Sequence, residues 1–394
     1  MVIFNDFVFS TCNRSLLFKL LTFYFLLCTL YFFTMHIKSL KLENFRSWSK
    51  YEIELSPITI LIGPNGVGKT NLMESLWLLS TGRSWRTNKD AELIQWDKDY
   101  ARVVAEIEKN GKESSMELFL QHRLSKDYAQ TKVLKVNGVR KRLLDLLGIM
   151  PGVLFSPESI EMLDGAPATR RRFLDIMLSE MDFTYATSLG DYNKILKERN
   201  KLLLMIKTGH SKEDELEFWD EKLAEAGKII IGKRKKAIGF FNKHLTEAYE
   251  ALSGKDEKLV LRYKETVDPD RFEETLFAHH EREIQQTSTL IGPHRDDWTT
   301  LLNNRDITTF GSRGEFRTAV LALITAQLRY LEQEMGEKPV LLLDDIFSEL
   351  DADRRAKLAN IVQNQQTIIT TTDLDHIEKG LREKAKIVKI GVRV

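Results

Sequence analysis

A glycine-rich segment constrains the fold of this chain more than any other feature of its sequence. The segment fits the pattern G-x-x-x-x-G-K-[ST], follows the apolar run at residues 58–62 and precedes an amphipathic stretch at residues 71–80. Its members are Gly63, Pro64, Asn65, Gly66, Val67, Gly68, Lys69 and Thr70. A continuous apolar run is typical of a buried parallel strand, and a helix is expected to follow the turn. The segment therefore predicts an α/β fold built on a strand, a tight loop and a helix.

This loop also predicts a chemistry. Its glycines allow backbone N–H groups to surround phosphate oxygens, and the N-terminus of the following helix adds a positive dipole end. Lys69 is expected to neutralise phosphate oxygens, while the hydroxyl of Thr70 is a candidate ligand for Mg²⁺. We therefore expect the loop to bind ATP together with Mg²⁺.

A second acidic motif lies near the C-terminal end of the chain. The apolar residues 340–343 are followed directly by Asp344 and Asp345, as expected for a buried strand that ends in two carboxylates. In phosphate-loop enzymes such a carboxylate holds Mg²⁺, which is the role predicted for Asp344. Asp345 is the candidate to orient or deprotonate an attacking water. The same pattern could be a strand end capped by solvated acids, but the phosphate loop favours the catalytic interpretation.

A third segment, at residues 310–315, leads into a helix expected at residues 315–335. Ser312 and Gly314 would offer a hydroxyl and free backbone N–H groups to an anion at the start of that helix. Such a Ser-x-Gly segment is common, so its position shortly before the acidic strand is what makes it informative.

The pattern of apolar residues divides the chain into parts. Residues 35–156 and 286–394 carry strand-like runs and helices and are predicted to form one ATPase domain. Residues 157–285 are dominated by long helical patterns and are predicted to form a helical second lobe, inserted or adjoining. The heptad regularity in that lobe is too weak and short for a long coiled coil.

Residues 1–34 differ from the rest, because residues 16–33 are almost wholly apolar apart from Lys19. This extension could be a membrane anchor, a signal peptide without a small-residue cleavage site, or no part of the working protein. We favour the last, because Met35 begins a sequence suited to a soluble domain, and we expect no membrane association. Both cysteines, Cys12 and Cys28, lie in the extension, which excludes a disulfide scaffold for the body and suits a reducing cytoplasm.

The order of these motifs resembles the ABC-ATPase heads of the SMC-like proteins, and narrower matches resemble the RecF family. The phosphate loop comes first, the Ser-x-Gly segment precedes the acidic strand, and Ser-Glu-Leu-Asp at residues 348–351 follows it. The segments similar to RecF lie at residues 36–48, 81–86, 157–175 and 292–297. Together they span most of residues 35–394.

This resemblance implies a function in replication and recombinational repair. It implies binding of ATP and of DNA at single-strand gaps or single-strand/double-strand junctions, help in RecA loading with RecO and RecR, and support of the SOS response. Ser312 and Gly314 would contact the γ-phosphate held by a second copy, so that ATP drives homodimerisation, and Asp351 would line that interface. Asp345 stands where most ABC ATPases carry Glu, so slow hydrolysis is expected. Thr371 and Thr372 occupy the region where many ABC ATPases place a histidine sensor.

Two other functional classes remain open from the sequence. The chain could be the ATPase subunit of a membrane transporter, although one apolar segment makes no translocation path. It could also be a chromosome-structuring SMC head, although the long coiled coil is missing.

Contacts with DNA must come from local clusters of basic residues, because the formal net charge is only +1. Three clusters are candidates, and such clusters would bind phosphates without reading sequence. The residues predicted to contact DNA are Arg140, Arg142, Arg170, Arg171, Lys235 and Lys236. The alternative for each cluster is a solvated helix face or a set of intramolecular ion pairs.

Overall fold

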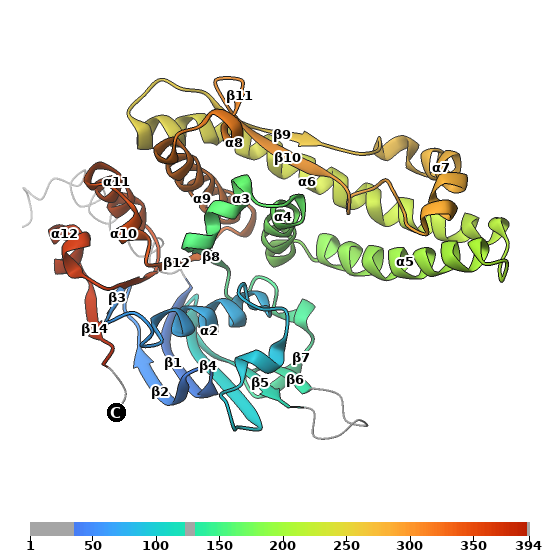
Figure 1. The fold of residues 1–394 in the computed structure, drawn as a ribbon. Coiled ribbons are helices and arrows are strands. Elements are labelled where there is room, and N and C mark those ends of the chain that lie inside the picture. Colours follow the sequence, from blue (N-terminus) through green and yellow to red (C-terminus); the bar gives the residue numbers. More distant parts are fainter. Residues whose placement is uncertain (1–34, 123–130, 392–394) are drawn as a thin grey trace, which may run out of the picture.

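The computed structural model describes residues 35–122 and 131–391, and Figure 1 shows how their elements are arranged. The extension predicted for residues 1–34, with Cys12 and Cys28, lies outside the described residues. Among the helices of the described residues, none has the length and apolar character needed to cross a membrane.

One layer of the molecule is an antiparallel sheet with the strand order β2-β1-β4-β5-β6-β7. Alternating buried and exposed side chains, as in residues 36–45, let one face of this sheet cover a core while the other meets solvent. The strands are β1 (His36–Phe45), β2 (Trp48–Glu54), β4 (Tyr100–Lys109), β5 (Lys112–Gln121), β6 (Thr131–Val136) and β7 (Val139–Lys141).

A second sheet is parallel throughout and has the order β14-β3-β13-β12-β8. The side chains of its three central strands are almost all buried, because both faces of the sheet are covered. Its strands are β3 (Ile58–Ile62), β8 (Gly152–Phe155), β12 (Val340–Asp344), β13 (Thr367–Thr371) and β14 (Lys386–Lys389). The register sets Asp344 beside Thr370 of β13, which in turn pairs with β3. The C-terminal ends of the phosphate-loop strand β3 and the acidic strand β12 therefore lie at the same end of the sheet, one on either side of β13.

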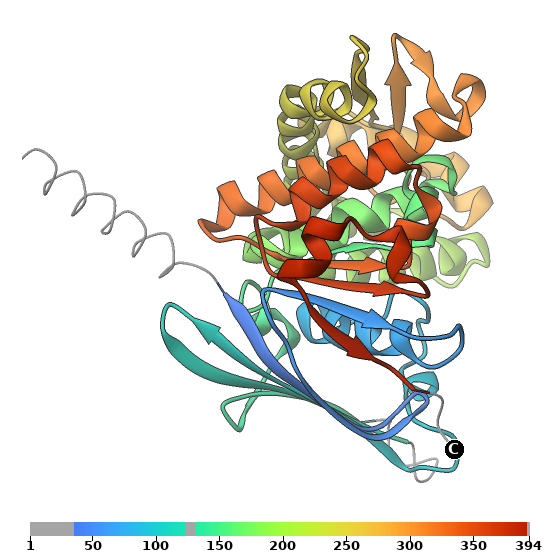
Figure 2. The same ribbon diagram turned by 90° about the vertical axis from the view of Figure 1, so that its left-hand side faces the viewer.

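Helix α2 (Lys69–Thr81) lies between these two sheets, as Figure 2 shows. Its apolar side chains share one core with the inner face of the antiparallel sheet and with one face of the parallel sheet. The predicted helix at residues 71–80 is therefore present, and it begins two residues earlier, within the loop motif itself.

The helices of the middle region cover the other face of the parallel sheet and extend beyond it (Figure 1). The longest, α6 (Leu216–Ser253), packs against α5 (Phe183–Lys207) and α9 (Arg313–Met335). The other helices are α3 (Glu161–Asp164), α4 (Pro167–Met181), α7 (Phe272–Gln286), α8 (Ile307–Phe310), α10 (Ile346–Glu349), α11 (Ala352–Val362) and α12 (Lys379–Lys384). The helix predicted at residues 315–335 corresponds to α9.

The middle region also contains a strand that the helical pattern did not predict. β9 (Leu259–Lys264) pairs antiparallel with β10 (Asp297–Leu302), which continues into the short β11 (Arg305–Asp306). This pairing joins residues on either side of position 285, where the domain boundary was expected. Because the partner strand lies more than 30 residues away, local periodicity carries little sign of it. The division into an ATPase domain and a lobe at residues 157–285 stays a prediction.

Candidate nucleotide-binding site

The loop at residues 63–70 has a backbone that depends on its glycines. Gly66 and Gly68 have φ angles of 79° and 103°, in the left-handed region that side chains disfavour. A Cβ atom on Gly68 would lie 2.8 Å from Ser47 Oγ, and one on Gly63 would lie 2.4 Å from the carbonyl oxygen of Ile390. The glycine spacing therefore reflects steric need as well as the motif.

Lys69 is the first residue of α2, and its side chain turns back over the loop. Its Nζ donates hydrogen bonds to the carbonyl oxygens of Gly63 at 2.6 Å and Pro64 at 2.9 Å. Burial lowers the pKa of Lys69, and the charges of Asp345 and Asp344 oppose this effect. The structure thus places a partly desolvated cation against the loop and close to both acidic side chains.

Asp344 and Thr70 come together from distant parts of the chain. Thr70 Oγ1 donates to Asp344 Oδ1 at 3.2 Å, and Thr370 Oγ1 donates to the same oxygen at 2.7 Å. Burial raises the pKa of Asp344, although both hydrogen bonds favour the ionised carboxylate.

These two side chains fit a Mg²⁺ ion that completes its ligand set elsewhere. Both offer hard oxygen atoms, and Mg²⁺ is usually held by one or two protein groups together with waters and substrate phosphates. No group of three or more His, Cys, Asp or Glu side chains suited to hold a metal occurs in residues 35–122 and 131–391. The donor set matches an ion that arrives with a nucleotide better than a resident metal.

Asp345 adopts an unusual backbone conformation next to this pair. Its φ of 53° is left-handed, and its N–H donates to Thr370 Oγ1 at 2.9 Å. Within the described residues, its buried Oδ1 has no hydrogen-bond partner. Burial raises the pKa of Asp345, and Lys69 opposes the rise. A buried acceptor without a partner suits a water or a ligand atom.

The sequence interpretation missed His376, which lies near Asp345. The charge of His376 acts to lower the pKa of Asp345, so the two groups are close. The Nδ1 atom of His376 is buried and has no hydrogen-bond partner in the described part of the chain. The histidine sensor of many ABC ATPases is expected at the end of β13, where Thr371 and Thr372 stand, whereas His376 lies five residues beyond that strand's end, in a short 3₁₀ turn (Leu374–His376). Because His376 does not directly follow β13, no sequence pattern next to the strand indicated it.

Ser312 and Gly314 lie at the start of α9, as expected. Ser312 caps the helix, with its Oγ accepting from the Glu315 N–H at 3.3 Å and its own N–H donating to Glu315 Oε2 at 2.7 Å. Arg354 approaches from α11, close to Gly314, and pairs with Asp351. Neither Ser312 nor Gly314 forms a hydrogen bond with the loop at residues 63–70 across the described ranges.

Glu74 anchors the segment after α2 to the helix. This carboxylate is fully buried and accepts from Arg46 through both oxygens, at 2.7 and 2.9 Å. Ser84 Oγ donates to Glu74 at 2.5 Å, and Arg86 Nη1 lies 3.4 Å from it. The nucleotide-loop helix and residues 84–86 thus share one charge network.

The basic clusters differ in how they are used within the chain. Arg170 makes a two-pronged pair with Asp297, both contacts at 2.7 Å, and Arg171 donates to the carbonyl of Asp296 at 2.8 Å. Lys235 pairs with Glu265, and Lys236 pairs with Glu334 at 2.9 Å. Arg170, Lys235 and Lys236 thus form the intramolecular ion pairs that were the alternative to DNA contacts. Arg171 forms a hydrogen bond with a backbone carbonyl instead.

The cluster on and after β7 is the most open of the three. Arg140 is exposed and forms no ion pair with any described residue, whereas Arg142 is exposed and pairs locally with Asp145 at 2.9 Å. Local ion pairs on the surface contribute little to the stability of a protein, so such a pair costs little to break. Arg140 and Arg142 therefore keep the strongest case for contacts with DNA.

Comparison with known proteins agrees with this architecture. The family described as RecF/RecN/SMC N terminal domain matches residues 36–391. A DNA replication and repair protein RecF from Agathobacter rectalis is 36% identical over 357 residues, which cover 90% of this chain and 97% of that protein. The corresponding protein from Clostridium botulinum is 38% identical over 360 residues, covering 89% and 96%.

Solved structures give the same result. The recombination mediator protein RecF-ATP in the RecFOR pathway superimposes with a TM-score of 0.82 at 35% identity, covering 88% of this chain and 94% of that one. An Smc head domain derived from Pyrococcus furiosus gives a TM-score of 0.53 at 18% identity, covering 91% and 94%, a likeness in fold alone. This chain therefore belongs to the RecF family of DNA replication and repair proteins and has the ABC-ATPase head fold that this family shares with the SMC proteins.

Proposed function

We propose that this chain is an ATP-dependent DNA-binding protein that acts at single-strand gaps and single-strand/double-strand junctions. In this proposal it helps to load RecA with RecO and RecR in the cytoplasm and supports the SOS response. The observation that carries the ATP part is the meeting of Lys69 and Thr70 with Asp344 and Asp345 at one sheet edge. Family membership and the match to RecF-ATP support the repair part.

In this proposal the loop at residues 63–70 holds the phosphates, and Thr70 and Asp344 hold Mg²⁺. The ion, when bound, neutralises charge on the phosphate oxygens. Lys69 adds a second positive charge, and Asp345 accepts a proton from the attacking water at its Oδ1. The shorter aspartate side chain makes hydrolysis slow, so nucleotide serves mainly as a switch.

The switch is the association of two copies. Ser312 and Gly314 of one copy contact the γ-phosphate bound by the other, so ATP binds the dimer better than the monomer and drives its formation. The position of Ser312 at the N-cap of α9, with no hydrogen bond to the loop of its own copy within the described residues, supports an intermolecular contact. ADP lacks the group that bridges the copies and leaves the protein monomeric.

ATP is expected to tighten DNA binding roughly tenfold relative to ADP, the usual size of coupling between two ligands. The measurement is fluorescence anisotropy of a labelled junction DNA titrated with the full chain and Mg²⁺. Lys69→Met should remove the difference, because the loop loses its cation. Equal affinity with ATP and ADP in the wild-type chain would contradict nucleotide-gated DNA binding.

Ser312→Arg is expected to weaken ATP-driven dimerisation by at least about tenfold, because a bulky cation would replace the hydroxyl at the γ-phosphate. Sedimentation analysis with ATP and Mg²⁺ measures the dimer, and calorimetry checks that ATP still binds. Ser211→Arg, in the turn between α5 and α6, is the matched control and should dimerise normally. Dimers of unchanged strength in Ser312→Arg would remove this segment from the interface.

A further inference from the structure

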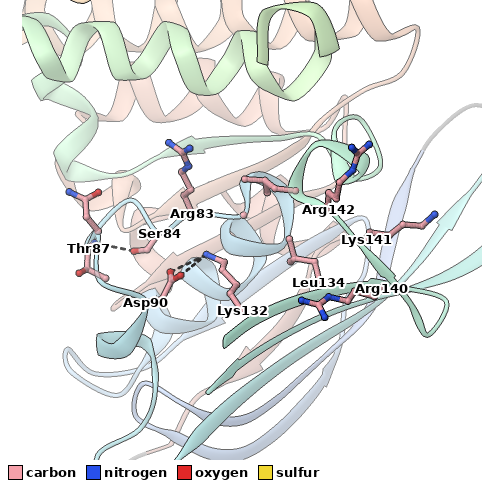
Figure 3. Close-up of a pocket in the computed structure, with 12 residues that line it drawn as sticks. Arg83, Ser84, Thr87, Asp90, Lys132, Leu134, Arg140, Lys141 and Arg142 are labelled. Atoms are coloured by element: carbon pink, nitrogen blue, oxygen red, sulfur yellow. Dashed lines mark hydrogen bonds and ion pairs between the residues drawn. The ribbon is translucent and has the colours of Figure 1, made fainter. Parts of the chain in front are cut away.

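A recess of about 540 Å³ lies between the segment that follows α2 and the β6–β7 hairpin, and five of its twelve lining residues are basic (Figure 3). We call it the basic pocket. Its charged lining residues are Arg83, Lys132, Arg140, Lys141, Arg142 and Asp90. Five cations against one carboxylate make this a strongly positive hollow in a protein that is nearly neutral overall.

Three of these five cations form no ion pair in the part of the chain that the structure describes, whereas Arg142 pairs with Asp145 and Lys132 with Asp90. Lys132 forms an ion pair with Asp90, and its Nζ lies 3.0 Å from each carboxylate oxygen, as Figure 3 shows. Within the described residues, Arg83, Arg140 and Lys141 are exposed and form no ion pair. Three free cations around a recess create a local potential that attracts anions.

A second cavity, of about 520 Å³, adjoins the basic pocket and shares Arg83, Asn88 and Leu143 with it. It adds Arg171 and Arg172, which donate to backbone carbonyls of Asp296 and Ser84 and pair with no carboxylate of the described residues. Burial and the neighbouring charge of Arg83 lower the pKa of Arg172. The positive charges of Arg83 and Arg172 repel each other, and a bound anion would reduce this repulsion.

We propose that the basic pocket binds the phosphates of a single DNA strand. This inference deepens the DNA binding proposed above and rests on it, and it adds Arg83, Lys132 and Lys141 to Arg140 and Arg142. The volume is that of a small-ligand site, which admits a nucleotide or two of one strand and is too small for a duplex. No aromatic side chain of the described residues lines the basic pocket, so the pocket would hold phosphates and stack no bases. Binding there would be independent of sequence.

The test compares two labelled DNA probes, a duplex with a single-stranded tail and the same duplex with blunt ends, titrated with ATP and Mg²⁺. The double variant Arg83→Gln/Arg140→Gln should bind the tailed probe about tenfold more weakly at physiological salt, because two phosphate contacts are lost. The slope of log affinity against log salt should fall by roughly 1.4, at about 0.7 for each contact with a single strand. Binding of the blunt probe should change by less than twofold.

Lys50→Gln is the matched control, because Lys50 is exposed, forms no ion pair with a described residue and lies on β2, at the opposite edge of the same sheet. It should leave both probes unaffected. Unchanged thermal stability and ATP affinity of the double variant would confirm that its fold and nucleotide site are intact.

The outcomes separate the pocket from the wider function. If the wild-type chain binds neither probe, the DNA-binding function and the pocket assignment both fail. If the wild type binds the tailed probe in an ATP-dependent way and the double variant binds it equally well, the pocket assignment alone is overturned. Equal losses on both probes would assign the cations to a duplex and overturn the single-strand inference. A further outcome is that inorganic tripolyphosphate protects the pocket segments from proteolysis while the double variant binds DNA normally. That result would assign the pocket to a small anion and overturn the DNA inference.

Discussion

Asp345→Asn is expected to slow ATP hydrolysis by about 10²–10⁴-fold, the usual contribution of a positioned general base. The amide cannot accept the proton of the attacking water, whereas its size and its polar contacts stay close to those of the carboxylate. ATP binding and ATP-driven DNA binding should therefore persist, and the protein should stay longer in its ATP state. Single-turnover hydrolysis of radiolabelled ATP measures the step directly.

The pH dependence of this step has a definite sign. Burial raises the pKa of Asp345, so its base form is lost at a higher pH than for an ordinary aspartate. The hydrolysis rate of the wild-type chain should rise as pH increases through that raised pKa, and the Asp345→Asn variant should lack this rise. Asp353→Asn, an exposed carboxylate on α11 that pairs with Lys357, is the control and should hydrolyse ATP at the wild-type rate. Full activity in Asp345→Asn would show that another group activates the water.

Arg199→Met is expected to lower the free energy of unfolding by about 3–5 kcal/mol, as removal of one partner from a buried ion pair usually does. Arg199 is fully buried on α5 and contacts Asp220 at 2.7 Å and Glu283 at 2.6 Å, tying together α5, α6 and α7. Methionine would leave Glu283 buried without its cationic partner and Asp220 with only its contact to His280. Urea denaturation followed by circular dichroism measures the loss.

Arg271→Met provides the comparison for this prediction, because its pair with Glu274 is exposed on both sides. Exposed pairs contribute about 0–1 kcal/mol, so this variant should be nearly as stable as the wild type. A similar loss in both variants would mean that burial of the Arg199 network carries no special stability.

Features encoded by adjacent residues were predictable from the sequence. The loop at residues 63–70 and the acidic strand end at Asp344 and Asp345 combine motif and periodicity in short stretches, and the structure has the strands and helices expected around them. The parallel α/β fold followed from those apolar runs.

Features that depend on distant partners were not predictable from local pattern. β9 is a strand because β10 pairs with it, and the helical character of the surrounding residues hid this. Lys235 and Lys236 are similar in sequence to the residues of β7, yet Glu265 and Glu334 engage them in the folded chain. Arg83 shows the converse case, since nothing in its neighbourhood along the chain predicts the basic pocket.

The position of α2 has a mechanical consequence. Its thirteen residues span about 20 Å, with Lys69 and Thr70 at one end and its C-cap, Gly82, in the wall of the basic pocket at the other. A Cβ atom on Gly82 would lie 2.1 Å from Leu143 Cδ1, so there is no slack where the helix meets the pocket. Between these ends, Arg46 pairs with Glu74 of the helix. Because α2 is a single short helix joining the two places, we expect an axial displacement at the nucleotide loop to be felt at the basic pocket.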